Sequence, residues 1–258
     1  MMRIDSVRQP GSFFGDGSPS EVFVPGDDRY SRVIRFLEGR YPAGGIDVGF
    51  RALSTEVRAW MRKALTLRYS WAIPSPEVLD RIVELTGNAG LVEAGAGTGY
   101  WASLLDARGV DVLAFDACPP GTGDRMRSSF HATQRRTWHP VIECDVDSMP
   151  WNDLAERTLF LCWPPYAESM GADALTAFAA AGGRDVIYIG EGDGGCTGDD
   201  VMWSVLEGSA VWDASDEECE SARGRQMFRE VEDAFEGVTL PQWDGLYDYP
   251  RLFRRGAP

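Results

Sequence analysis

The sequence predicts a doubly wound α/β fold with a mostly parallel sheet and a helical N-terminal extension. Apolar runs of strand length alternate with helical or irregular stretches, and the first run ends in a glycine-rich turn. The runs cover residues 91–94, 111–115, 141–144, 158–163 and 185–189, and the stretches between them include 99–108, 167–181 and 199–208. Continuous apolar strands separated by helices are typical of a parallel sheet covered on both faces. Such sheets bind ligands beyond the carboxyl ends of their strands.

The chain has 258 residues, a length that fits one α/β domain better than two. Residues 1–28 are rich in Gly, Pro, Ser and Asp, and we expect them to form a flexible arm. A single domain is expected over 29–258, with N-terminal helices over 29–88 and the α/β core over 89–258.

Local signals place the helices that precede the sheet and the strands that end it. Apolar residues at helical spacing predict helices over 27–38 and 52–67. Ser75-Pro76 predicts the start of a third helix, because serine favours the N-cap and proline the first helical position. Apolar residues at 210–212 and 252–253 are candidates for the last strands.

The charge balance disfavours nucleic acid as a partner. The chain carries 40 acidic and 25 basic residues and a net charge of −15, whereas a duplex-binding protein needs a positive face. Arginines cluster in the weakly periodic segment 117–138, at positions 125, 127, 135 and 136. We interpret these arginines as solvated loop residues, and a local patch for nucleic acid is the alternative. The segment 117–138 as a whole is a candidate for part of a substrate lid.

The cysteines indicate a reducing compartment. Five cysteines without a Cys-x-x-Cys pair argue against a zinc site and against a disulfide framework, so we expect no metal and a cytoplasmic location. The longest apolar runs have the length of strands, and no membrane span is expected.

A glycine-rich turn follows the first strand of the series. Residues 91–100 read Leu-Val-Glu-Ala-Gly-Ala-Gly-Thr-Gly-Tyr. Dinucleotide sites use Gly-x-Gly-x-x-Gly, whose third glycine would fall where the bulky Tyr100 stands. Glu93 in the strand would repel a pyrophosphate but would suit the ammonium group of a methionine moiety. The spacing therefore argues against NAD and for S-adenosylmethionine (SAM).

The segment Glu-x-Gly-x-Gly-x-Gly resembles the first motif of the class I methyltransferases, which take a methyl group from SAM. This resemblance implies a Rossmann-like fold in which Asp116, after the second strand, accepts the ribose hydroxyls and Asp145, after the third, meets the adenine amino group. Helix capping and solvation are the alternative roles for these acids. Tyr69 and Trp71 are expected to close over the cofactor. The predicted cofactor residues are Tyr69, Trp71, Glu93, Gly95, Ala96, Gly97, Gly99, Asp116, Asp145 and Cys162.

The fourth strand ends in Cys-Trp-Pro-Pro-Tyr at 162–166, and consecutive prolines cannot continue a parallel strand. The segment resembles the [Asn/Asp/Ser]-Pro-Pro-[Tyr/Phe] motif of methyltransferases that act on planar amines. In that motif the polar side chain and a proline carbonyl accept hydrogen bonds from the target nitrogen, and the aromatic residue stacks on the substrate. Trp163 stands at the polar position and accepts no hydrogen bond through its side chain. It would stack on a ring or a cation instead, and a buried tryptophan capping the sheet is the alternative.

We predict a SAM-dependent methyltransferase with a small-molecule acceptor, cationic or amine-bearing, and a nitrogen target favoured over oxygen or carbon. Trp163 and Tyr166 are expected to line the acceptor site. Glu168 and Glu191 are candidates for accepting a proton or for pairing with a cationic substrate. One alternative is methylation of a protein side chain or a nucleic-acid base, and another is an inactive SAM-binding interaction module.

Overall fold

The computed structural model describes residues 54–121, 131, 134, 136–208, 226–243 and 245–256. Several predicted features lie outside these residues: the arm over 1–28, the helix over 27–38, the strand at 210–212 and the arginines at 125, 127 and 135. In the part that is described, no helix is both long enough and apolar enough to cross a membrane.

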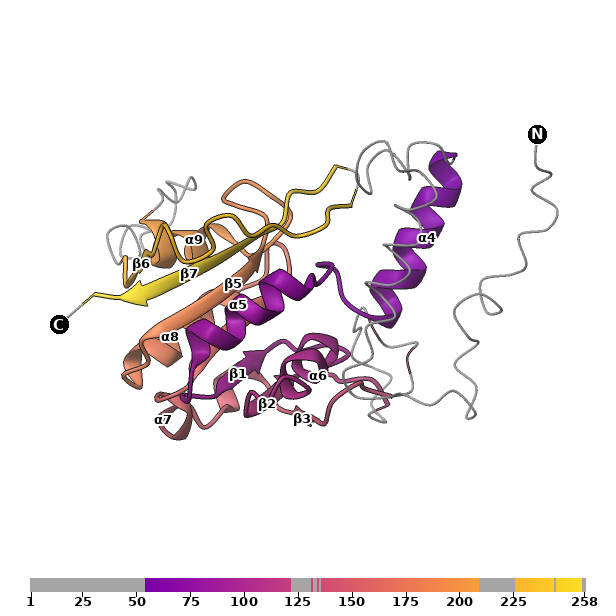
Figure 1. The fold of residues 1–258 in the computed structure, drawn as a ribbon. Helices are drawn as coiled ribbons and strands as arrows, with labels where there is room; N and C mark the ends of the chain where they lie inside the picture. Colours follow the sequence, from indigo (N-terminus) through magenta and orange to yellow (C-terminus); the bar gives the residue numbers. More distant parts are fainter. Residues whose placement is uncertain are drawn as a thin grey trace.

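A seven-stranded sheet forms the centre of the described chain (Figure 1). Its strands are β1 (Leu91–Ala94), β2 (Val112–Asp116), β3 (Val141–Glu143), β4 (Thr158–Cys162), β5 (Asp185–Gly190), β6 (Phe228–Glu230) and β7 (Tyr249–Arg255). In the order β3-β2-β1-β4-β5-β7-β6, the first five strands are parallel, and β7 runs antiparallel to both of its neighbours. The predicted fold class is confirmed. The strand order reverses between β1 and β4, where doubly wound sheets bind their ligands.

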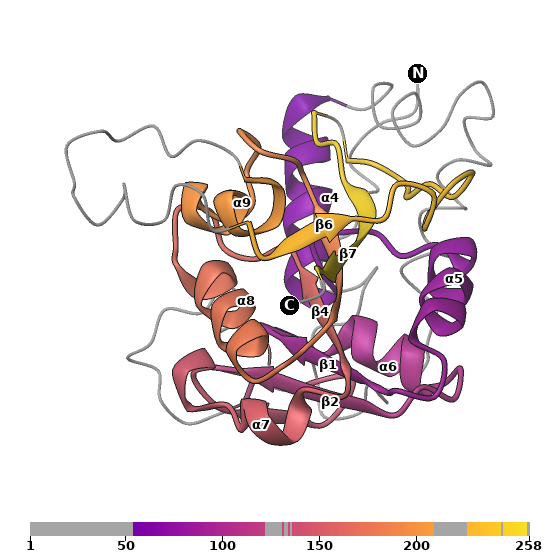
Figure 2. The same ribbon diagram turned by 90° about the vertical axis from the view of Figure 1, so that its left-hand side faces the viewer.

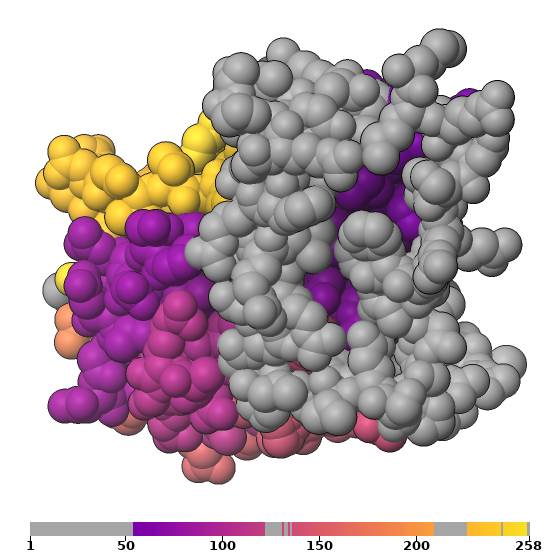
Figure 3. Space-filling view, turned by 45° about the vertical axis from the view of Figure 1, so that its right-hand side comes forward, coloured from indigo at the N-terminus to yellow at the C-terminus, as the bar shows by residue number. Residues whose placement is uncertain are grey.

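Helices cover both faces of the sheet (Figure 2). They are α4 (Thr55–Arg68), α5 (Pro76–Thr86), α6 (Tyr100–Asp106), α7 (Trp151–Leu154), α8 (Met170–Ala180) and α9 (Asp200–Glu207), with a short 3-10 helix, η2 (Val146–Ser148). The apolar residues of α5 and α6 belong to the core on one face, and those of α7, α8 and α9 belong to the core on the other. Figure 3 shows the outer surface of α5 and α6 in violet and magenta, below the yellow C-terminal segment.

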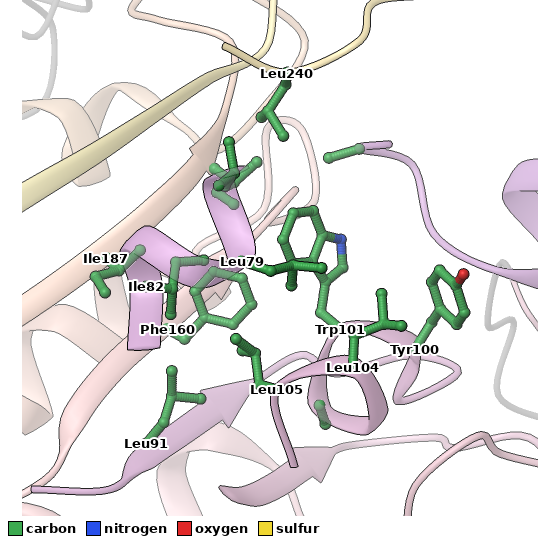
Figure 4. Packing of buried hydrophobic residues seen from close by; sticks show 14 of the residues in the cluster. Leu79, Ile82, Leu91, Tyr100, Trp101, Leu104, Leu105, Phe160, Ile187 and Leu240 are labelled. Atoms are coloured by element: carbon green, nitrogen blue, oxygen red, sulfur yellow. The ribbon is translucent and has the colours of Figure 1, made fainter. Parts of the chain in front are cut away.

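Helix α5 begins where its sequence signals place it. The Ser75 hydroxyl accepts a hydrogen bond from the Val78 N–H at 3.3 Å, and Pro76 occupies the first helical position. Its buried face packs with α6 over the sheet. Figure 4 shows this packing, formed by Leu79 and Ile82 of α5, Trp101, Leu104 and Leu105 of α6, Leu91 of β1 and Phe160 of β4. This layer fixes α6, and with it the glycine turn that precedes α6.

Candidate functional site

A cavity of about 990 Å³ lies at the carboxyl ends of β1, β2, β3 and β4. Its walls are built by the segments that leave these strands and by residues 69–71. The predicted residues on its walls are Tyr69, Trp71, Glu93, Gly95, Ala96, Gly97, Asp116, Asp145, Cys162, Trp163, Tyr166 and Glu168. Gly99 and Glu191 are not among the lining residues.

The glycine turn has a backbone that other residues rarely adopt. Gly95, Gly97 and Gly99 have φ angles of 74°, 53° and 68°, in the left-handed region. A Cβ at Gly95 would lie 2.7 Å from Cε of Met170, and one at Gly97 would lie 2.9 Å from the His131 ring. Glycine is therefore favoured at both positions by its backbone conformation, and at Gly97 also by the His131 ring beside it.

Asp116 ties the end of β2 to the glycine turn. Its Oδ2 accepts a hydrogen bond from the Gly97 N–H at 2.8 Å, and its Oδ1 accepts one from the Cys118 N–H at 2.8 Å. An ionised carboxylate has about four acceptor positions, so each oxygen can accept a further hydrogen bond from a ligand. The carboxylate is thus held rigidly with acceptor capacity left at the cavity wall.

Glu93 is a buried acid that lines the cavity. Its side chain is 2% exposed, in a strand flanked by β2 and β4. Burial raises its pKa to about 8, the nearby Asp116 raises it as well, and the backbone N–H of Ala102 lowers it. Within the described chain, Oε2 of Glu93 has no hydrogen-bond partner. A buried acceptor without a donor is costly, so a cationic group that reached this oxygen would be stabilised by it.

Asp145 and the segment after it form the cavity wall beyond β3. Asp145 is exposed, directly precedes η2 and lines the same cavity as Glu93 and Asp116. The sheet thus brings together three acids that are separated in sequence by strands and helices.

The segment 69–71 lies against the glycine turn and lines the same cavity. The Thr98 hydroxyl donates a hydrogen bond to the Tyr69 carbonyl. The Tyr69 ring stacks on the Trp138 ring, with centroids 5.2 Å apart, and lies 4.9 Å from the ring of Tyr100. Trp71 stacks on Trp163 with ring centroids 4.7 Å apart and an angle of 11° between the planes.

The chain turns sharply after β4, as the consecutive prolines predict. Trp163 has a left-handed φ of 56°, and its backbone N–H donates to the Ile189 carbonyl at 2.8 Å. The ring of Tyr166 is 67% exposed at the cavity wall, and Glu168 is an exposed acid close by in sequence. Cys162 lies just before the turn, and burial, with the neighbouring Glu93 and Asp248, raises the pKa of its thiol.

Glu191 follows β5 and is predicted to face the site, but the structure places its side chain away from the cavity. It is buried, and its Oε2 accepts from the Cys196 N–H at 2.8 Å while its Oε1 accepts from the Tyr247 N–H at 3.0 Å. The carboxylate therefore joins two backbone segments and does not line the cavity.

Two residues near the site carry no local sequence signal. His131 lines the cavity beside Gly97, its Nδ1 lies 3.1 Å from the Leu67 carbonyl oxygen, and burial lowers its pKa. Asp248 is 1% exposed, and its Oδ1 accepts a hydrogen bond from Nε1 of Trp163 at 2.7 Å. The rarity of histidine, which occurs twice in the chain, could have drawn attention to His131.

The charged groups on the cavity walls have one sign. The acids that line it are Glu93, Asp116, Asp145, Asp147, Glu168 and Asp173. Among the described residues that line the cavity, none is lysine or arginine. This described part of the lining therefore favours ligands that carry positive charge.

Comparisons with known proteins give distant structural likenesses. No family model and no curated protein matches the sequence. The chain is similar to magnesium protoporphyrin IX methyltransferase from Synechocystis PCC 6803 with bound SAM, at 12% identity and a TM-score of 0.42, over 93% of this chain and 100% of that one. It is similar to human N-acetylserotonin methyltransferase in complex with SAM, at 17% identity and a TM-score of 0.39, over 89% and 66% of the two chains. A third structure, from work on the conversion of a disulfide bond into a thioacetal group during echinomycin biosynthesis, has 15% identity and a TM-score of 0.36, over 78% and 92%. At this level of similarity, the likeness concerns the fold alone.

Proposed function

We propose that this protein is a SAM-dependent methyltransferase that acts on a small molecule. The observation that carries the proposal is the unpartnered Oε2 of Glu93, buried at the wall of a cavity that also holds the glycine turn and Asp116. A buried carboxylate is stabilised when a cationic donor binds it. The methionyl ammonium group of SAM is such a donor.

The same cavity is unsuited to a dinucleotide. Tyr100 is 1% exposed and contacts the rings of Tyr69 and Trp138, so its side chain fills the space that a third glycine would leave open. The acidic walls would repel a pyrophosphate, whereas SAM carries a sulfonium and an ammonium group. We assign the ribose hydroxyls to Asp116 and the adenine amino group to Asp145, as the family resemblance implies.

We assign the acceptor to the wall that contains Trp163 and Tyr166. SAM supplies an electrophilic methyl group on its sulfonium, and the chain's part is alignment of the nucleophile with that methyl group. The flat faces of the two aromatic side chains can hold a planar or cationic molecule. The carboxylate of Glu168 can pair with an amine and accept its proton. The acidic lining supports a cationic or amine-bearing acceptor and a nitrogen target.

Calorimetry with three ligands tests the proposal. SAM and S-adenosylhomocysteine should bind the full chain, and NAD should not, because Tyr100 and the acids at the cavity wall exclude it. Tight NAD binding, or the absence of binding by both SAM-type ligands, would overturn the proposal.

Replacing Asp116 with alanine should weaken SAM binding by at least about tenfold, because hydrogen bonds to a charged group contribute roughly 1.5–3 kcal/mol each. Asp116→Asn, which keeps one acceptor oxygen, should give an intermediate loss. Titration calorimetry measures both, and Asp153→Ala on the exposed side of α7 is the control. Unchanged affinity in a folded Asp116→Ala variant would contradict the assignment of the ribose to this side chain.

A further inference from the structure

The conformation of Trp163 needs support from its surroundings. A φ of 56° is costly for any residue with a Cβ, and Trp163 is one of two non-glycine residues in the described chain that have a positive φ. The stacking of its ring on Trp71 and the hydrogen bond from its Nε1 to Asp248 hold the side chain at two points. The conformation of the wall therefore depends on groups outside the Pro-Pro-Tyr turn.

Asp248 belongs to a segment that contacts both stacked tryptophans. It directly precedes β7, and its backbone is fixed by Gln242: Nε2 of Gln242 donates to the Asp248 carbonyl at 2.7 Å, and the Asp248 N–H donates to Oε1 of Gln242 at 2.7 Å. Nε1 of Trp243 donates to the Trp71 carbonyl at 3.1 Å. Trp243 thus holds the backbone of Trp71, and Asp248 holds the indole of Trp163.

Asp248 itself does not line the cavity. Its side chain is 1% exposed, and within the described residues its Oδ2 has no hydrogen-bond partner. Burial raises the pKa of Asp248 to about 7. The hydrogen bond from the indole N–H of Trp163 lowers this pKa, and the charge of Glu191 raises it. A carboxylate that is kept in this position at such a cost, and that contacts the cavity through Trp163, acts by placing the indole.

We propose that Asp248 is a positioning residue that fixes the Trp163 indole against Trp71 and so builds the aromatic wall of the acceptor site. The assignment of this wall to the acceptor rests on the proposed function, whereas the link between Asp248 and the stacked pair does not. Asp248 comes from the C-terminal part of the chain, whereas the cavity is lined mainly by residues 69–71 and by the segments that follow the parallel strands.

Circular dichroism tests the link without an acceptor. Two stacked indoles couple electronically and give an exciton couplet in the spectrum. The Trp163→Phe variant lacks this pair, so the parent spectrum minus the variant spectrum gives the couplet. Asp248→Leu fills the volume without offering an acceptor and should lose the same couplet. Asp248→Asn keeps an acceptor oxygen and should retain it. Asp185→Ala, which removes an acid bonded to Arg254 at the other end of β5, is the matched control and should retain it too.

The outcomes separate this inference from the proposed function. A folded Asp248→Leu or Asp248→Ala variant with the full couplet would overturn the positioning role, and so would loss of the couplet in Asp248→Asn. In the same preparations, affinity for S-adenosylhomocysteine should stay within a few-fold of the parent, and a tenfold loss would contradict placement on the acceptor side. If the parent chain bound no S-adenosylhomocysteine, the proposed function would fail, and the couplet would still decide the role of Asp248.

Discussion

Replacing Glu93 with glutamine should remove a large pH dependence of stability. The pKa of Glu93 is about 8 in the folded protein, against an ordinary value of 4.5. Because the folded-state pKa is the higher one, this group's contribution to stability is full below pH 4.5 and is lost as the pH rises through 8. The difference between the two pKa values corresponds to roughly 4–5 kcal/mol. Urea unfolding at pH 5, 7 and 9 should therefore show the variant gaining on the parent as the pH rises.

Two comparisons sharpen this experiment. Glu143→Gln, an exposed substitution on β3, should follow the parent at every pH. The pKa of Asp248 is also raised, to about 7, so its contribution to the free energy of unfolding likewise falls as the pH rises. Because Asp248 remains in the Glu93→Gln variant, some pH dependence of stability persists there. Unfolding free energies of parent and Glu93→Gln that differ by a constant amount from pH 5 to 9 would contradict the burial of an ionisable Glu93.

The same group should link SAM binding to proton release. A methionyl ammonium beside Glu93 stabilises the charged carboxylate, so binding should lower its pKa and release a proton near neutral pH. Below a pH of about 7.7, where the α-amino group of SAM stays protonated, SAM affinity should then rise with pH in the parent and stay level in Glu93→Gln. Calorimetry in buffers with different ionisation enthalpies counts the released proton directly.

Gly99→Ala should destabilise the protein by more than Gly208→Ala does, although the two glycines have almost the same backbone. Their φ and ψ are 68° and 24° for Gly99, and 72° and 22° for Gly208, so each substitution incurs the left-handed penalty of about 1–2 kcal/mol. A Cβ at Gly99 would also lie 2.9 Å from Cγ2 of Val141 and 3.2 Å from the His139 carbonyl oxygen. Overpacking of this kind costs typically 1–3 kcal/mol more.

Denaturant unfolding of the two glycine variants measures the difference. At Gly208 a Cβ would meet atoms of Gln226 no closer than 3.5 Å, which is ordinary contact, so this variant reports the backbone penalty without a clash. Equal losses of stability in the two variants would show that the chain around Val141 moves aside freely. The glycine turn would then tolerate a side chain at its third position.

The sequence predicted the parallel sheet closely because its signals are local. The run over 158–163 becomes β4 at Thr158–Cys162, and the run over 185–189 becomes β5 at Asp185–Gly190. The serine cap and proline of α5 act within one helical turn, so they place that helix without reference to the rest of the fold. The positive φ angles of the glycine turn follow from the same kind of signal, since glycine is the residue that adopts them readily.

The sequence could not predict features that depend on distant partners. Strand β6 has three residues, with an Arg and a Glu exposed, and it is a strand because β7 pairs with it. Glu191 stands after a strand like the acids of the cavity, but backbone N–H groups from its own loop and from Tyr247 hold its carboxylate elsewhere. Nothing near Asp248 in the sequence shows that its partner is an indole beside a Pro-Pro turn.

The hydrogen bond between Trp163 and Asp248 joins residues 85 positions apart in the sequence. The two partners are therefore synthesised at different times. At synthesis rates of about 5–20 residues per second, Asp248 leaves the ribosome roughly 4–17 s after Trp163. The glycine turn, Asp116 and Asp145 have by then been synthesised together with β1 to β3, and they can assemble before the anchor of Trp163 exists. In the nascent chain the half of the cavity that we assign to the nucleoside can therefore form first, and the aromatic wall is completed when β7 pairs with β5.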